Sequence, residues 1–189
     1  MALIRFQNVS ETFARGGGSK LLRSYVGLIL QRPKHDPFFA LKDVTFTVEH
    51  GESVAIIGSK ADLPVAKQII DAVPAGCVVD GVGTLSLLAS AELIGRAQAI
   101  VTNDSAPQHL ASAMGTPTLA IFGPTVPEFG FGPLAERKAV AGHSGLSCRP
   151  CHRHGPQRCP LGHWRCMREL TPDYISSLLT EVLNPPVPV

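Results

Sequence analysis

The chain has 189 residues, of which 44% are hydrophobic and 17% charged. This composition is sufficient for a buried core and excludes a disordered chain. The net charge of +2 is too small to indicate a nucleic-acid partner. The N-terminus lacks the continuous apolar segment of a signal peptide, and no apolar run is long enough to span a bilayer. We therefore expect a cytoplasmic protein, with peripheral contact to the inner face of the membrane left open.

The first part of the chain predicts strands with one helix between them. Apolar and polar residues alternate over 2–9 and again over 40–49, as in half-buried strands. An amphipathic helix is predicted over 20–31, where two following prolines end it. A short apolar run over 53–57 predicts a buried strand that ends at Gly58.

After Gly58, short apolar runs alternate with helical patterns, which predicts a parallel sheet flanked by helices. Gly115 is typical of a helix terminator, and Thr171 is a good helix N-cap followed by proline. The predicted strands are 77–79, 99–101 and 118–122, and the predicted helices are 63–73, 85–97, 106–114 and 171–183.

The segment ALKDVTFTVEHGESVAIIG, residues 40–58, resembles the start of a polysaccharide-export ABC transporter ATPase. In that family the strand pair leads into a phosphate loop with a second glycine, a lysine and a Ser or Thr. Leu63, Pro64 and Val65 stand in those places here, so ATP hydrolysis is excluded. Residues 1–57 are interpreted as an ABC-ATPase-like segment that stops before this loop.

From about residue 54 the chain resembles glycosyltransferase family 9, the ADP-heptose:lipopolysaccharide heptosyltransferases. The matching pieces are VAIIGSKAD, GVGTLSLLASAELIGRAQAIVTNDSAPQHLASAMGTPTLAIFGPT and CRPCHRHGPQRCPLGHWRCMRELTP. The resemblance implies that residues 58–184 form part of a GT-B donor domain, a Rossmann-like parallel sheet with flanking helices. A Cys-rich loop lies at 148–166, residues 185–189 are expected to be a disordered tail, and the two families meet within 53–58.

The motif from Thr102 to His109 stands where a predicted strand meets a predicted helix. Ligands of open α/β sheets bind at such junctions, where free helix amides and the helix dipole favour anions. Ser105 and Gln108 also have the spacing of a capping box, so Asp104 and Ser105 have a purely structural interpretation as well.

The family resemblance implies a sugar-nucleotide site at this motif. Asp104 would hydrogen-bond a sugar hydroxyl, and the amides of Ser105 and Ala106 would meet the diphosphate. His109, one turn into the helix, would reach the same phosphates. The segment 123–125, after the next strand, would form a neighbouring wall or a plain turn.

Asp62 follows the strand that ends at Gly58. By resemblance, it stands near the position of an acid that contacts the nucleotide ribose. Its alternative interpretation is an N-cap ahead of the helix that begins at Leu63.

Four of the five cysteines lie in the Cys-rich loop, namely Cys148, Cys151, Cys159 and Cys166. A Cys-x2-Cys pair followed by two further cysteines is compatible with structural zinc, but the later spacing departs from a second Cys-x2-Cys pair. Reduced structural thiols are the expected state, and we assign no metal ligand and no cofactor.

The sequence thus predicts a sugar-nucleotide-binding domain, with an ADP-heptose-like donor, related to lipopolysaccharide or cell-surface glycan synthesis. The resemblance implies a glycosyltransferase, yet nothing in the chain resembles the acceptor domain or its general base, and we expect catalysis to be incomplete. No catalytic residue is assigned. The alternatives are an ABC ATPase remnant that pairs with a transporter and a non-functional fusion product.

Overall fold

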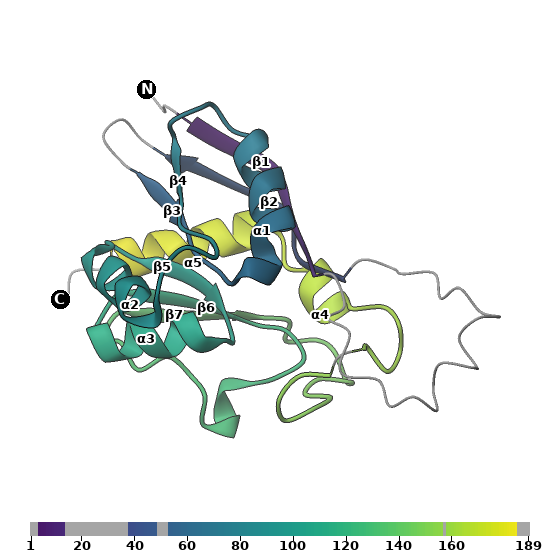
Figure 1. Ribbon diagram of the computed structural model, residues 1–189. Helices are drawn as coiled ribbons and strands as arrows, with labels where there is room; N and C mark the ends of the chain where they lie inside the picture. The colour runs from purple at the N-terminus through teal and green to yellow at the C-terminus, as the bar shows by residue number, and fades with distance from the viewer. Residues whose placement is uncertain (1–3, 14–37, 49–52, 157, 185–189) are drawn as a thin grey trace, which may run out of the picture.

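A computed structural model describes residues 4–13, 38–48, 53–156 and 158–184. The helix predicted over 20–31 and the tail over 185–189 lie outside the described residues. In Figure 1 helices cover a small sheet, and a separate strand pair lies beyond the C-terminal helix.

The elements follow the predicted order, with strands shifted by one to a few residues. The strands are β1 (Ile4–Phe13), β2 (Phe38–Val48), β3 (Val54–Ile56), β4 (Val78–Asp80), β5 (Ile100–Asn103), β6 (Thr118–Phe122) and β7 (Lys138–Gly142). The α-helices are α1 (Leu63–Asp71), α2 (Leu87–Arg96), α3 (Ala106–Met114), α4 (Arg165–Arg168) and α5 (Pro172–Leu183), and 3-10 helices span Lys60–Asp62 and Pro127–Phe129.

The described strands form three sheets. β1 and β2 pair antiparallel, β3 and β4 pair in parallel, and β5, β6 and β7 form a parallel sheet with β6 in the centre. The predicted α/β class with parallel strands and flanking helices is confirmed, although the described strands divide into two parallel sheets. β7 was not predicted, because its sequence KAVAG is short and small and has no clear periodicity.

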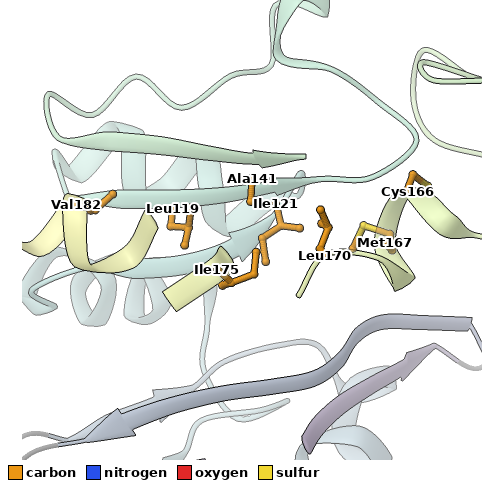
Figure 2. Close-up of a cluster of buried hydrophobic side chains, with 8 residues drawn as sticks. All are labelled: Leu119, Ile121, Ala141, Cys166, Met167, Leu170, Ile175 and Val182. Carbon is orange, nitrogen blue, oxygen red and sulfur yellow. The ribbon is translucent and has the colours of Figure 1, made fainter. Parts of the chain in front are cut away.

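Strand β6 is the centre of the core, since all five of its residues are buried. Leu119 and Ile121 face the last two helices, where they meet Met167, Ile175 and Val182 (Figure 2). A continuous apolar run with a hydrogen-bonded neighbour on each side is typical of a central parallel strand. This packing fixes the position of the carboxyl end of β6.

Helix ends near the sheet agree with the sequence signals. Gly115 has a left-handed conformation with φ 70° and closes α3, as predicted. Thr171 caps α5, because its hydroxyl accepts a hydrogen bond from the Tyr174 amide at 3.3 Å. Both signals are local, which explains why the sequence reveals them.

The N-terminal strand pair packs on the rest of the chain. β2 lies against α4 and α5, and β1 lies against α1 (Figure 1). The segment compared with ABC ATPases therefore joins the helices that cover the parallel strands.

The buried position of Leu119 gives a test of the core. Leu119 is 0% exposed and Leu88, on α2, is 81% exposed. We expect Leu119→Ala to lower the free energy of unfolding by about 2–5 kcal/mol, because it leaves a cavity beside β6. Leu88→Ala is the matched control and should change it by less than about 0.5 kcal/mol. Chemical denaturation of both variants checks this, and equal losses would contradict the placement of β6.

Candidate functional site

Asp104 stands at the carboxyl end of β5, between this strand and β6. Its amide donates to the carbonyl of Ile121 at 3.1 Å, which continues the pairing of the two strands. Its Oδ2 accepts a hydrogen bond from Thr125 Oγ1 at 2.7 Å, and Thr125 is buried. The carboxylate is therefore held at the sheet edge where open α/β folds bind ligands. Thr125 thus lies beside Asp104, and the role of 123–125 as a neighbouring wall of a ligand site stays a prediction.

The predicted capping box of Ser105 and Gln108 is wrong. The Ser105 side chain makes no cap hydrogen bond to α3, and its Oγ donates instead to the carbonyl of Asn103 at 3.2 Å. Gln108 is fully buried, and its Nε2 donates to the carbonyl of Phe131. Because the Gln108 side chain points into the interior, it cannot reach back to Ser105, and the capping box does not form.

The first turn of α3 consequently lacks a side-chain cap. Ser105 and Ala106 are both exposed, and the first turn holds no acidic residue. The first amides of a helix have no intrahelical acceptor, and the helix dipole places partial positive charge there. This end of α3 is therefore suited to an anion such as a phosphate group.

His109 lies one turn into α3 and is exposed. Its ring makes an edge contact with Phe131, with centroids 6.4 Å apart. Phe131 contacts His154 of the Cys-rich loop in turn, at 6.0 Å. The imidazole is thus outside the core and beside the N-terminal half of α3, and its contact with phosphates stays a prediction.

Asp62 has a local structural partner. Its Oδ2 accepts hydrogen bonds from the Ser59 amide and the Ser59 hydroxyl, both at 2.7 Å, in a capping box of the 3-10 helix. Asp62 is the N-cap residue of α1, as its alternative interpretation has it, but its side chain makes no cap hydrogen bond to that helix. Within the described residues no hydrogen bond or ion pair joins Asp62 to Asp104. The structure brings Asp104, Ser105, Ala106 and His109 together at one junction and places Asp62 in the 3-10 helix that follows β3.

Arg149 is a positioning residue that the sequence did not reveal. Its guanidinium donates to the carbonyls of Gly123 at 2.7 Å, His143 at 2.9 Å and Phe122 at 3.1 Å. A Cβ on Gly142 would overlap this guanidinium and displace it from these carbonyls. The contacts join the Cys-rich loop to the ends of β6 and β7. Because all three acceptors are backbone carbonyls, no residue pattern could have indicated them.

The four cysteines of the Cys-rich loop line one small cavity with His163. Burial and the neighbouring thiols raise the pKa of the Cys166 thiol to about 11. Burial also acts to raise the pKa of Cys159, but backbone amides of residues 161–164 donate toward its sulfur and bring the pKa below its ordinary value. The thiols are free, and Cys148 Sγ lies 3.8 Å from His163 Nε2.

The described side chains around this cavity do not form a ready metal site. Among the residues that the structure describes, no group of three or more His, Cys, Asp or Glu side chains is arranged to hold a metal ion. Zinc therefore remains an alternative prediction for the four cysteines.

The thiol pKa values predict an order of alkylation. Only the thiolate reacts, and at mildly alkaline pH Cys159 has a larger thiolate fraction than Cys166, whose pKa is near 11. We expect iodoacetamide to modify Cys159 before Cys166, and the rate at Cys166 to keep rising with pH up to its pKa near 11. Peptide mass spectrometry measures both rates. Urea-unfolded protein is the control, in which the two rates should converge; early labelling of Cys166 in the folded protein would contradict its burial.

The fold and the β5–α3 junction define a parallel α/β domain with a candidate anion site at its carboxyl edge. A family model described as glycosyltransferase family 9 (heptosyltransferase) matches residues 40–163. The chain therefore belongs to this family. The match begins before residue 54 and includes most of β2 and all of the segment 40–58 that resembles an ABC ATPase.

Similar proteins of known name support the family. The chain is 34% identical over 96 residues to lipooligosaccharide heptosyltransferase 2 of Haemophilus influenzae, and this covers 49% of the chain and 28% of that protein. It is 40% identical over 76 residues to lipooligosaccharide heptosyltransferase 2 of Campylobacter jejuni, covering 40% of the chain and 22% of that protein. The chain thus spans about a quarter of the length of these relatives.

Solved structures agree on the fold. The ADP-heptose lps heptosyltransferase II of Escherichia coli matches with a TM-score of 0.57 and 26% identity, over 70% of this chain and 37% of that chain. A glycosyl transferase family 9 protein of Veillonella parvula matches with the same TM-score at 21% identity, a likeness of fold alone. Among the described residues, no helix is both long and apolar enough to cross a membrane.

Proposed function

We propose that this chain binds the sugar-nucleotide donor of a heptosyltransferase-type reaction. Asp104 would accept a hydrogen bond from a sugar hydroxyl, the amides of Ser105 and Ala106 would bind the diphosphate, and His109 would add a contact to the same phosphates. The observation that carries the proposal is the β5–α3 junction. There a carboxylate fixed by Thr125 stands directly before an uncapped, exposed helix N-terminus.

Charge placement at the junction supports a phosphate ligand with an attached sugar. The start of α3 attracts anions, whereas the Asp104 carboxylate repels them and accepts hydrogen bonds from hydroxyl groups. Thr125 occupies Oδ2, and within the described residues no hydrogen bond is formed to Oδ1. A molecule that joins a diphosphate to a polyhydroxylated sugar satisfies both halves of the site.

The names of the similar proteins indicate which donor to test. The similar E. coli structure is that of an ADP-heptose lps heptosyltransferase. We therefore propose an ADP-heptose-like donor and a role in lipopolysaccharide or related glycan synthesis. Asp62 stays a predicted ribose contact, and its bond to Ser59 leaves Oδ1 for that purpose.

The proposal concerns donor binding. Transfer to an acceptor needs a base within hydrogen-bond reach of the attacking hydroxyl. We assign no such base, neither Asp104 nor His109 nor any described residue near them. Transfer by this chain, on an acceptor that is itself a membrane glycolipid, is a separate question from donor binding.

Donor binding is tested by thermal stability in the presence of ligand. A ligand that binds only the folded state stabilises it, by about 2.7 kcal/mol at a hundredfold excess over Kd. We expect ADP-heptose to raise the Tm of the wild-type chain and Asp104→Asn to abolish most of this rise. Asparagine can still accept the hydrogen bond from Thr125, so the variant should fold, but it loses the negative charge and one acceptor.

The matched control is Asp71→Asn. Asp71 is an exposed carboxylate at the end of α1, in an ion pair with Lys67 at 2.9 Å, and its replacement should leave the Tm rise intact. Absence of any rise for the wild-type chain at saturating ADP-heptose would contradict donor binding. An undiminished rise for Asp104→Asn would place the donor elsewhere.

A further inference from the structure

The positive charge of this chain is concentrated in one segment. Residues 137–168 hold seven Lys and Arg, four His and no Asp or Glu. The rest of the chain holds ten Lys and Arg against fifteen Asp and Glu. The net charge of +2 therefore combines a strongly basic segment with an acidic remainder, and such a segment attracts polyanions.

Within the described residues, two of the four arginines of the Cys-rich loop have no protein partner for their side chains. Arg149 is engaged by backbone carbonyls, and Arg165 pairs with Glu169. Arg153 and Arg158 are exposed, and within the described part of the chain neither makes a hydrogen bond or an ion pair. Their charges are open to solvent.

Both arginines lie on one loop that projects from the thiol cavity. Cys151 and Cys159, on either side of the loop, line the same cavity. The Cys151 amide also donates to the carbonyl of Pro124 at 3.1 Å, which fixes the start of the loop. We call residues 152–156 together with Arg158 the basic loop. Because Cys151 and Cys159 line the same cavity, both arginines belong to a single loop whose two ends lie together.

An exposed apolar side chain stands beside the basic loop. Leu161 is 64% exposed, in the turn closed by Gly162, whose φ is +72°. Cations next to a protruding apolar side chain are typical of a surface that meets anionic lipid, where charge attracts the headgroups and the apolar group enters the interface. A free phosphate ion would bind the arginines but would leave Leu161 exposed to water, so the apolar side chain favours a lipid surface as the partner.

The basic loop lies on the side of the candidate donor site. His154 of the loop contacts Phe131 at 6.0 Å, and Phe131 contacts His109 of α3 at 6.4 Å. Anything bound along the loop is therefore next to the N-terminal half of α3.

We propose that the basic loop and Leu161 dock this chain on an anionic lipid surface. Docking there holds a membrane-borne acceptor beside the donor site. The lipid contact stands on its own observations, and only the presentation of an acceptor rests on the proposed function.

The test is binding of the full chain to vesicles at low ionic strength. We compare phosphatidylcholine vesicles with vesicles that also contain phosphatidylglycerol, by co-sedimentation. The wild-type chain should prefer the anionic vesicles. Arg153→Gln with Arg158→Gln should weaken this binding about 25-fold, since each basic residue near such a surface contributes about fivefold. Leu161→Ser should also weaken it, without a change in charge.

The matched control is Lys67→Gln with Arg96→Gln. It removes the same charge from side chains that are 75% and 77% exposed on α1 and α2, and binding should stay near that of the wild type. Equal losses in the two double variants would overturn the proposal, because net charge alone would then explain binding. A wild-type chain with no preference for anionic vesicles would overturn it too. So would displacement by inorganic phosphate at constant ionic strength, which would indicate a small-anion site.

The Tm rise with ADP-heptose, measured on the same variants, separates the two proposals. Arg153→Gln with Arg158→Gln should retain it. In this double variant, loss of vesicle binding with an intact Tm rise supports the docking surface. A missing Tm rise in the wild type contradicts donor binding, and the vesicle comparison then still decides whether the docking surface exists.

Discussion

The burial of strand β6 is the constraint on which the site depends. Its five residues are enclosed by β5 and β7 at the sides and by the side chains of α4 and α5 on one face. A central strand of a parallel sheet cannot shift its register without moving its apolar side chains out of the core. Its carboxyl end is therefore fixed, and the residues that bind to this end are fixed with it.

Asp104 and Arg149 connect the fixed end of β6 to the candidate site. Asp104 bonds by its amide to Ile121 and by its carboxylate to Thr125, on either side of the end of β6. Arg149 bonds to the carbonyls of Phe122 and Gly123 and brings the Cys-rich loop to the same edge. The start of α3 and the basic loop are thus two features of one sheet edge. We propose that the first binds a sugar nucleotide and the second an anionic lipid surface.

Much of this arrangement could be predicted from local patterns. Helix α3 was predicted with its observed bounds, and Gly115 ends it as expected. β6 was predicted over its observed residues, four of which form an apolar run after Thr118. Asp104, Ser105, Ala106 and His109 were found through the family motif, and the structure gathers them at one junction.

The failures concern contacts between distant segments. The Ser105–Gln108 capping box was wrong, since Gln108 turns inward to the carbonyl of Phe131, 23 residues away along the chain. The same holds for Arg149, which reaches back 26 and 27 residues to carbonyls that have no signature in the sequence. Asp62 shows the opposite case. Its partner Ser59 is only three residues away, but Asp62 both ends the 3-10 helix and precedes α1. Its side chain bonds within the 3-10 helix and not to α1.

The central claim is that the β5–α3 junction binds the diphosphate of the donor. The most direct measurement is the change in backbone amide chemical shifts on titration with ADP-heptose. The account predicts the largest changes at Asp104, Ser105, Ala106 and His109, with a smaller change at Thr125. Changes confined to other segments, such as residues 59–62, or no change at saturating ligand, would contradict it.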